Sequence, residues 1–94
     1  MPLRKDWEDL AENGQKGDWY FLNDDTYITI RYGDDTLEVV TIPISVTGSP
    51  TAWQWDGNKE APTLSPSIKI TGGKSRANAE LWHGYMRAGQ LINA

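Results

Sequence analysis

The side chain best suited to acid–base chemistry is His83, the single histidine of the chain, because imidazole exchanges protons near neutral pH. A catalytic histidine also needs a nucleophile, an orienting carboxylate and an oxyanion site, and the sequence places none of these at a fixed spacing from it. We therefore expect His83 to form a structural hydrogen bond or to be exposed, and we predict no catalytic residue. A role as metal ligand is weaker, because its partners could only be carboxylates.

Two serine hydroxyls flank a proline in the segment Ser65-Pro66-Ser67, and such hydroxyls could bind a phosphate. Phosphate sites often use a glycine-rich loop that opens a helix, and none accompanies this segment. A strand at the edge of a sheet explains the segment as well, because a proline there discourages pairing with another sheet. We favour this structural interpretation.

Aromatic and basic side chains in the second half of the chain could bind a small nucleotide. Aromatic rings stack on nucleobases with about 1–3 kcal/mol per base, and basic groups bind phosphate. The alternative is that the rings form the core that a small chain must build from a few large side chains. The candidate ligand-binding residues are Trp53, Trp55, Lys69, Arg76, Trp82, His83, Tyr85 and Arg87.

Carboxylates are concentrated in the first half of the chain: residues 1–47 hold ten acidic and four basic side chains, whereas residues 48–94 hold three and five. An acidic surface can imitate a phosphate backbone and occupy the basic groove of a nucleic-acid-binding protein. Such residues are also ordinary in solvated turns. The predicted partner-binding residues are Asp6, Glu8, Asp9, Glu12, Asp24, Asp25, Asp34 and Asp35.

Composition narrows the class of protein. A chain of 94 residues makes one domain, over residues 1–94. The net charge of −4 argues against a general nucleic-acid binder, which needs a basic face. The absence of cysteine excludes disulfides, thiol catalysis and thiolate metal sites. No apolar run is long enough to span a membrane and the N-terminus lacks the apolar core of a signal peptide, so we expect a soluble cytoplasmic protein.

Apolar periodicity predicts one helix followed by strands. Leu3, Trp7, Leu10 and Ala11 share one face of a short helix over residues 3–14. Residues 17–92 read as a β-rich core, in which Pro43 and Pro66 indicate an edge or a bulge. Alternation in the last long strand places Trp82 and Tyr85 on opposite faces. We predict an α+β fold, mainly antiparallel, with the helix packed on a small sheet or sandwich of five to seven short strands.

Three ordered blocks in the C-terminal half are similar to a known family. They are Trp53-x-Trp55-Asp56-Gly57-Asn58, Pro62-Thr63-Leu64-Ser65-Pro66-Ser67-Ile68 and Trp82-His83-Gly84-Tyr85. Together they resemble a family of small, uncharacterised proteins common in bacteriophages and prophages, some of which are mislabelled ammonia monooxygenase. Many relatives carry a cysteine-rich knuckle, which looks like a structural zinc site, in the hairpin that here covers residues 30–35. Without cysteine, we expect turn chemistry and aromatic packing to hold that hairpin.

The resemblance and the acidic half together predict a non-enzymatic phage or prophage accessory protein. It would bind and inhibit a host protein or protein complex, such as a defence nuclease or a CRISPR complex, without contacting a membrane or nucleic acid directly. The alternative is a protein that binds or sequesters a nucleotide signal through its aromatic and basic residues. A virion assembly protein and a hydrolase are less favoured alternatives. We expect no cofactor, and the sequence leaves the oligomeric state open.

Overall fold

The computed structural model describes residues 3–71 and 80–94, which form one helix and seven strands. This arrangement confirms the predicted α+β class, with a short N-terminal helix and a small, mainly antiparallel sheet. The elements are α1 (Trp7–Asn13), β1 (Trp19–Leu22), β2 (Tyr27–Arg31), β3 (Val39–Ser45), β4 (Trp53–Trp55), β5 (Leu64–Thr71), β6 (Glu80–Arg87) and β7 (Gln90–Asn93).

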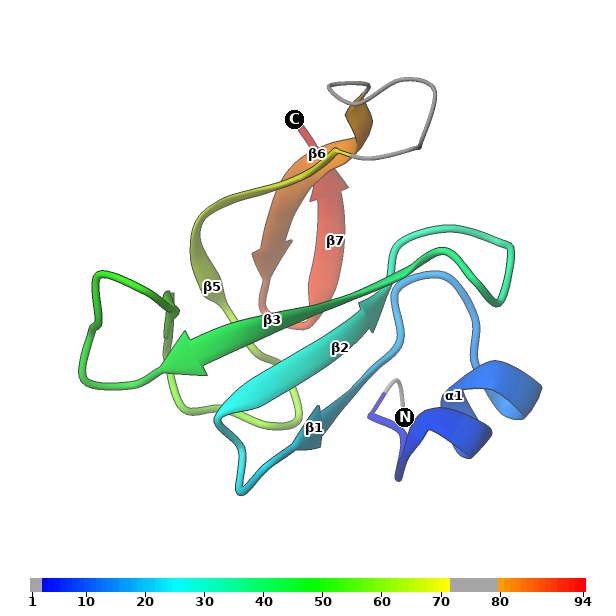
Figure 1. Cartoon of the computed structure of the whole chain (residues 1–94), viewed down its shortest axis with the longest axis horizontal. Coiled ribbons are helices and arrows are strands. Elements are labelled where there is room, and N and C mark those ends of the chain that lie inside the picture. Colours follow the sequence, from blue (N-terminus) through cyan, green and yellow to red (C-terminus); the bar gives the residue numbers. More distant parts are fainter. Residues whose placement is uncertain (1–2, 72–79) are drawn as a thin grey trace.

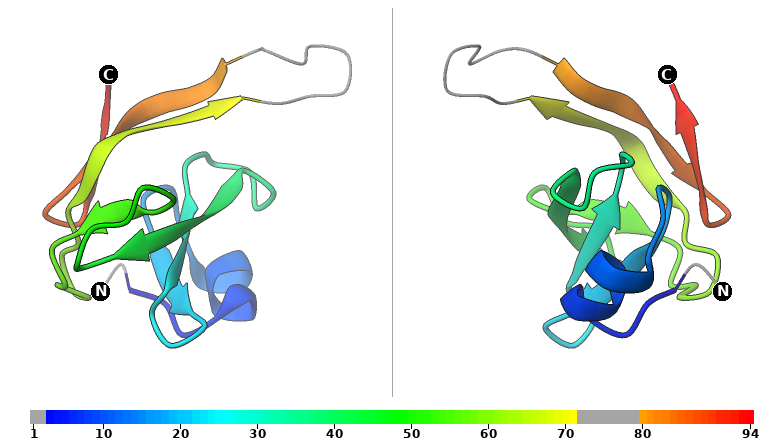
Figure 2. Two further views of the ribbon diagram at one scale, coloured as in Figure 1. Left: turned by 60° about the vertical axis from the view of Figure 1, so that its left-hand side comes forward. Right: turned by 90° about the vertical axis from the view of Figure 1, so that its right-hand side faces the viewer.

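The strands follow one another in the sheet in chain order, from β1 to β7. Neighbouring strands are antiparallel except β3 and β4, which run parallel through the pair Ile44 and Trp53. The sheet is curled, so that the β5–β6 hairpin lies over the part formed by β1–β3 (Figures 1 and 2). β3 is not an edge strand, contrary to one interpretation of Pro43, because it lies between β2 and β4 in the sheet; Pro43 pairs with Tyr27 of β2, and β4 pairs with β3 only from Ile44 onward.

The core fills the inside of this curl and contains side chains from six strands. Trp19 is fully buried, and its indole N–H donates to the carbonyl oxygen of Lys59 at 3.2 Å. A buried indole needs such an acceptor for its polar group. The core residues are Trp19, Ile28, Ile30, Ile42, Ile44, Trp55, Leu64, Ile68 and Met86.

The helix is shorter than its apolar spacing predicted. It begins after Asp6, whose carboxylate accepts the backbone N–H of Asp9 at 2.9 Å and caps the helix. Leu3 therefore lies outside the helix and forms a parallel bridge with Trp19 of β1. Of the predicted apolar face only Leu10 is buried, and Trp7 is 42% exposed. The N-cap overrides the apolar pattern, because it fixes where the helix starts.

The connection between β2 and β3, which we expected to be held by turn chemistry and aromatic packing, is held by a buried cation. The Arg31 guanidinium, on a residue that is 7% exposed, donates to the carbonyl oxygens of Gly14, Gly33 and Asp34. Turn hydrogen bonds contribute as expected, since the Glu38 carboxylate accepts the N–H of Asp35 at 3.1 Å. Aromatic packing contributes too, through rings of Tyr32 and Trp82 stacked at 6.4 Å. The sequence analysis did not anticipate the arginine.

No helix within residues 3–71 and 80–94 has the length and apolar character needed to cross a bilayer.

Candidate functional site

A serine and a histidine that lie 16 residues apart in the sequence meet on the β5–β6 hairpin. Ser67 Oγ is 3.2 Å from His83 Nε2, within hydrogen-bonding distance. The register pairs Lys69 with His83, so Ser67 is the diagonal neighbour of the histidine on the same face. This is the outer face of the hairpin, because Ile68, which points the other way, is buried in the core.

An irregularity in β5 positions Ser67. Three residues separate the paired positions 64 and 68 of β5, whereas the facing stretch of β6 contains only Tyr85. Such extra residues form a bulge, which bends the strand and re-aims its side chains. The bulge contains Pro66, as the sequence indicated, and the peptide bond that precedes this proline is cis. The bulge therefore sets the direction in which the Ser67 hydroxyl points.

Backbone contacts fix both residues of the pair. The indole N–H of Trp53 on β4 donates to the carbonyl oxygen of Ser67 at 3.4 Å. The backbone N–H of Ala94 donates to the carbonyl oxygen of His83 at 3.0 Å. Ser67 is thus tied to β4 and His83 to the segment that follows β7, so the pair does not depend on the hairpin alone.

Gly84, the residue after His83, allows Trp82 to lie across β6. A Cβ at position 84 would collide with the carbonyl oxygen of Ile92 and would lie 2.5 Å from the Trp82 ring. The indole N–H of Trp82 reaches Asn93 Oδ1 at 2.9 Å. Both neighbours of the histidine are therefore packed on the inner side of β6, which leaves the imidazole on the outer side.

The surroundings of the pair on the outer face are partly open. Ser67 and His83 are each half-buried, and Lys69 beside the histidine is exposed. The Arg87 guanidinium lies 4.4 Å from the centre of the Tyr85 ring, two residues along β6 from His83. A solvent-accessible hydroxyl within hydrogen-bonding distance of an imidazole supplies the nucleophile and the base of a serine hydrolase mechanism.

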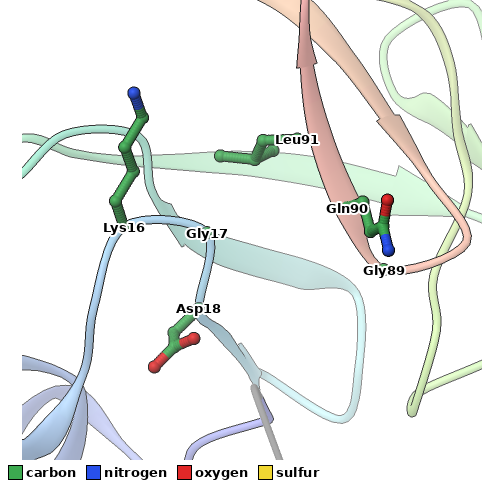
Figure 3. Close-up of a pocket in the computed structure, with 6 residues that line it drawn as sticks. All are labelled: Lys16, Gly17, Asp18, Gly89, Gln90 and Leu91. Carbon is green, nitrogen blue, oxygen red and sulfur yellow. The ribbon is translucent and has the colours of Figure 1, made fainter.

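Two depressions of the surface bear on where a ligand could bind. The larger, of about 410 Å³, lies between the loop of residues 16–18 and residues 89–91 around the β6–β7 turn (Figure 3). Neither Ser67 nor His83 lines it. A smaller one, of about 260 Å³, adjoins the serine because Pro66 forms part of its wall.

The predicted acidic partner-binding residues lie in three separate places. One group belongs to α1 and its N-cap: Asp6, Glu8, Asp9 and Glu12. The turn before β2 contains Asp24 and Asp25, and the turn after β2 contains Asp34 and Asp35. The length of β2 separates the two turns. Some of these charges are already paired: Asp25 lies 3.1 Å from the Lys59 ammonium. Hydrogen bonds from the Asn13 side chain and the Lys5 N–H lower the pKa of the Asp9 carboxyl. Their role in partner binding stays a prediction.

The predicted ligand-binding residues divide between the two sides of the sheet. Trp55 is buried, and Trp53 and Trp82 pack against the core. The remaining described members occupy the outer face, which places Trp82 and Tyr85 on opposite faces as predicted; these members are Lys69, His83, Tyr85 and Arg87. Arg76 lies outside the described residues. The structure therefore does not bring the whole set into one site.

The Ser67–His83 pair is the feature that the sequence analysis missed. Both strands were predicted, and two strands joined by a glycine-containing connection indicate a hairpin. Pairing them would have placed the Ser65-Pro66-Ser67 segment opposite the strand of His83. The bulge that directs Ser67 toward the imidazole has no clear sequence signature, so neither residue alone indicates the contact.

A serine hydroxyl beside an imidazole is one part of the arrangement that serine hydrolases use, and the comparison with known families bears on this pair. The chain belongs to a family described as bacterial ubiquitination-like system serine protease (BubE), whose model matches residues 6–94. No curated protein and no solved structure matches the chain.

This family membership corrects the functional prediction. The expected non-enzymatic phage protein that inhibits a host factor is wrong, as are the anti-defence role and the nucleotide-binding alternative, because the family is one of serine proteases. The expectation that the chain is not an enzyme is wrong for the same reason. Charge asymmetry alone does not establish a binding surface, because turns and a capped helix account for most of the acidic residues. The resemblance to phage proteins stays a prediction.

Proposed function

We propose that this chain is a serine protease in which Ser67 is the nucleophile and His83 is the general base. The observation that carries the proposal is the 3.2 Å contact between Ser67 Oγ and His83 Nε2. A base within about 2.6–3.2 Å of a hydroxyl can take its proton. Membership of the BubE family supports a role in a bacterial ubiquitination-like system.

The first half of the reaction forms an acyl-enzyme. Ser67 Oγ attacks the carbonyl carbon of the scissile bond, and its proton moves to His83 Nε2. The tetrahedral adduct then breaks its C–N bond, and the imidazolium gives the proton to the departing amine. The acyl part of the substrate remains as an ester on Ser67.

The second half restores the enzyme. His83 takes a proton from a water molecule as the water attacks the ester carbonyl. Collapse of the second adduct breaks the ester bond, and the imidazolium returns the proton to Ser67 Oγ. No other reactant is consumed, so one water is used for each peptide bond cleaved.

Ser67 is a better nucleophile than the neighbouring Ser65. Ser65 is paired with Gln54 of β4 and is exposed, whereas Ser67 contacts the imidazole. The reaction takes place in the cytoplasm in this proposal, as the sequence led us to expect.

Labelling with a fluorophosphonate probe tests the proposal, because an activated serine displaces fluoride from the probe and forms a P–O bond. We expect mass spectrometry of the digested, labelled protein to find one adduct, on Ser67. His83→Ala should slow labelling by about 10³-fold or more, since the hydroxyl loses its base. Ser67→Ala should abolish labelling.

Ser65→Ala is the matched control, because it removes a hydroxyl from the same three-residue segment. This variant should be labelled at the wild-type rate. Thermal unfolding of every variant shows whether it is folded. Labelling that survives in Ser67→Ala, or that is equally fast in folded His83→Ala, would contradict the proposal.

A further inference from the structure

One edge of β5 loses its neighbouring strand after Ser65. β4 pairs with β5 only through Trp55 with Leu64 and Gln54 with Ser65. Beyond this point β5 continues to Thr71, and its other edge is paired with β6. Within the described parts of the chain, no strand pairs with the β4 side of β5 from residue 66 onward, and Figure 2 shows the hairpin extending past β4.

The backbone of the nucleophile faces this edge. Its carbonyl oxygen accepts the indole N–H of Trp53, which belongs to β4 and so lies on the side away from β6. The Ser67 carbonyl therefore points to the edge along which an added strand would run, and β5 continues along this edge to Thr71.

A depression without charged side chains lies where this edge begins. It has a volume of about 260 Å³. Trp53 connects it with the nucleophile, because the same indole lines the depression and holds the Ser67 carbonyl. The lining residues are Pro50, Thr51, Ala52, Trp53 and Pro66.

The loop that forms one wall of the depression is internally held. Ser49 and Ala52 form a bridge, and the Thr51 N–H donates to Ser49 Oγ at 3.3 Å. A wall with its own hydrogen bonds keeps its shape before a ligand arrives, which is typical of binding pockets.

From the edge and the depression we infer that the substrate binds as an extended peptide along β5 and places an apolar side chain in the depression. This inference rests on the proposed role of Ser67. Backbone hydrogen bonds to a sheet edge align a peptide and side-chain pockets select its residues. A charged side chain is disfavoured in the depression, because it would lose water without gaining a partner there. The substrate class is therefore an unfolded segment with an aliphatic residue close to the scissile bond.

Peptidyl diphenyl phosphonates test the inference, because they react with an active serine, release phenol and carry a chosen residue next to the phosphorus. We expect a leucine analogue to label Ser67 at least about tenfold faster than a glycine analogue. A leucine analogue with an N-methylated amide lacks one donor for the edge and should label about tenfold more slowly than its parent.

Thr51→Phe fills the depression and should bring the leucine-to-glycine ratio close to one. Thr47→Phe is its matched control: Thr47 is also exposed, and its N–H donates to Ser45 Oγ at 3.3 Å as that of Thr51 donates to Ser49 Oγ. The control should keep the wild-type ratio. Ala52→Val narrows the same depression and replaces Thr51→Phe if that variant does not fold.

The outcomes separate this inference from the proposed function. The fluorophosphonate probe has no peptide part, so failure to label Ser67 with it would overturn the proposed function. Normal fluorophosphonate labelling, combined with equal rates or no reaction for the two phosphonates, would overturn the inference alone. A leucine preference that survives in folded Thr51→Phe, or a full rate for the N-methyl analogue, would overturn it as well.

Discussion

Replacing Arg31 by methionine should destabilise the protein by about 3 kcal/mol. The guanidinium donates to three backbone carbonyl oxygens, those of Gly14, Gly33 and Asp34, and so ties the segment after α1 to the β2–β3 connection. Methionine keeps the apolar stem of the side chain but has no donor. The three acceptors lose their partner, while the fold otherwise stays the same.

The magnitude follows from the number and setting of these hydrogen bonds. A hydrogen bond to a charged group contributes about 1.5–3 kcal/mol. The acceptors lie in half-buried or exposed residues and can regain water, so the low end applies and three bonds give about 4.5 kcal/mol. Part of this loss is offset, because the folded state of the variant no longer bears the cost of burying a cation at a residue that is 7% exposed. A loss of about 3 kcal/mol is large against the roughly 5–14 kcal/mol expected for a chain of this length.

Urea unfolding followed by tryptophan fluorescence measures this loss, and thermal unfolding should show a decrease of about 12–24 °C in Tm. Arg31→Lys should lie between wild type and Arg31→Met, because one ammonium cannot reproduce the planar arrangement of donors. Arg87→Met is the control, since Arg87 is exposed and only covers the Tyr85 ring. It should cost less than about 1 kcal/mol. Equal losses for Arg31→Met and Arg87→Met would refute the reasoning.

Three further substitutions test other contacts. Burial, and then the nearby Glu38 carboxylate, raise the pKa of the Tyr32 phenol, so its neutral form stabilises the folded state. This contribution is complete below the ordinary tyrosine pKa of about 10 and is lost as the pH rises through the raised pKa. As the pH rises above about 10, the unfolding free energy measured in urea should therefore fall less for Tyr32→Phe than for wild type. Gly84→Ala should cost about 1–3 kcal/mol in the same assay, because the new Cβ meets the Ile92 carbonyl and the Trp82 ring; an unchanged midpoint would show that β7 adapts freely. Trp53→Phe removes the indole donor to the Ser67 carbonyl and should slow fluorophosphonate labelling of Ser67 severalfold, whereas a wild-type rate would show that this hydrogen bond does not position the nucleophile.

The strands could be predicted from the sequence because their period-2 alternation is local. Ile28 and Ile30 lie in the core as their spacing predicted, although Thr29 and Arg31 on the other face are buried as well. Asn23, Asp24 and Asp25 form the expected turn with positive φ values. The end of the helix was less predictable. The apolar spacing extends to Leu3, on the N-terminal side of the N-cap. Only the tertiary bridge between Leu3 and Trp19 explains why Leu3 is not helical.

The site could be predicted only in part, because it depends on register. The residue type alone marks His83 as best suited to proton transfer, but nothing in the sequence distinguishes Ser67 from Ser65. The choice is made by the bulge at Pro66 and by the pairing of Lys69 with His83, both of which require the structure. The Arg31 contacts were hidden for the same reason, since Gly14 is 17 residues away in the sequence.

The inner side of β5 and β6 packs in the core, whereas the outer side carries the candidate site. Ile68 and Met86 hold the protein together from one side, and Ser67 and His83 project from the other, where truncating them opens no hole in the interior. Enzymes often sacrifice robustness for turnover because the same atoms serve both. Under the proposed mechanism the reacting and the packing side chains fall on alternate residues of β5 and β6, so evolution could change the reacting side chains without changing the core.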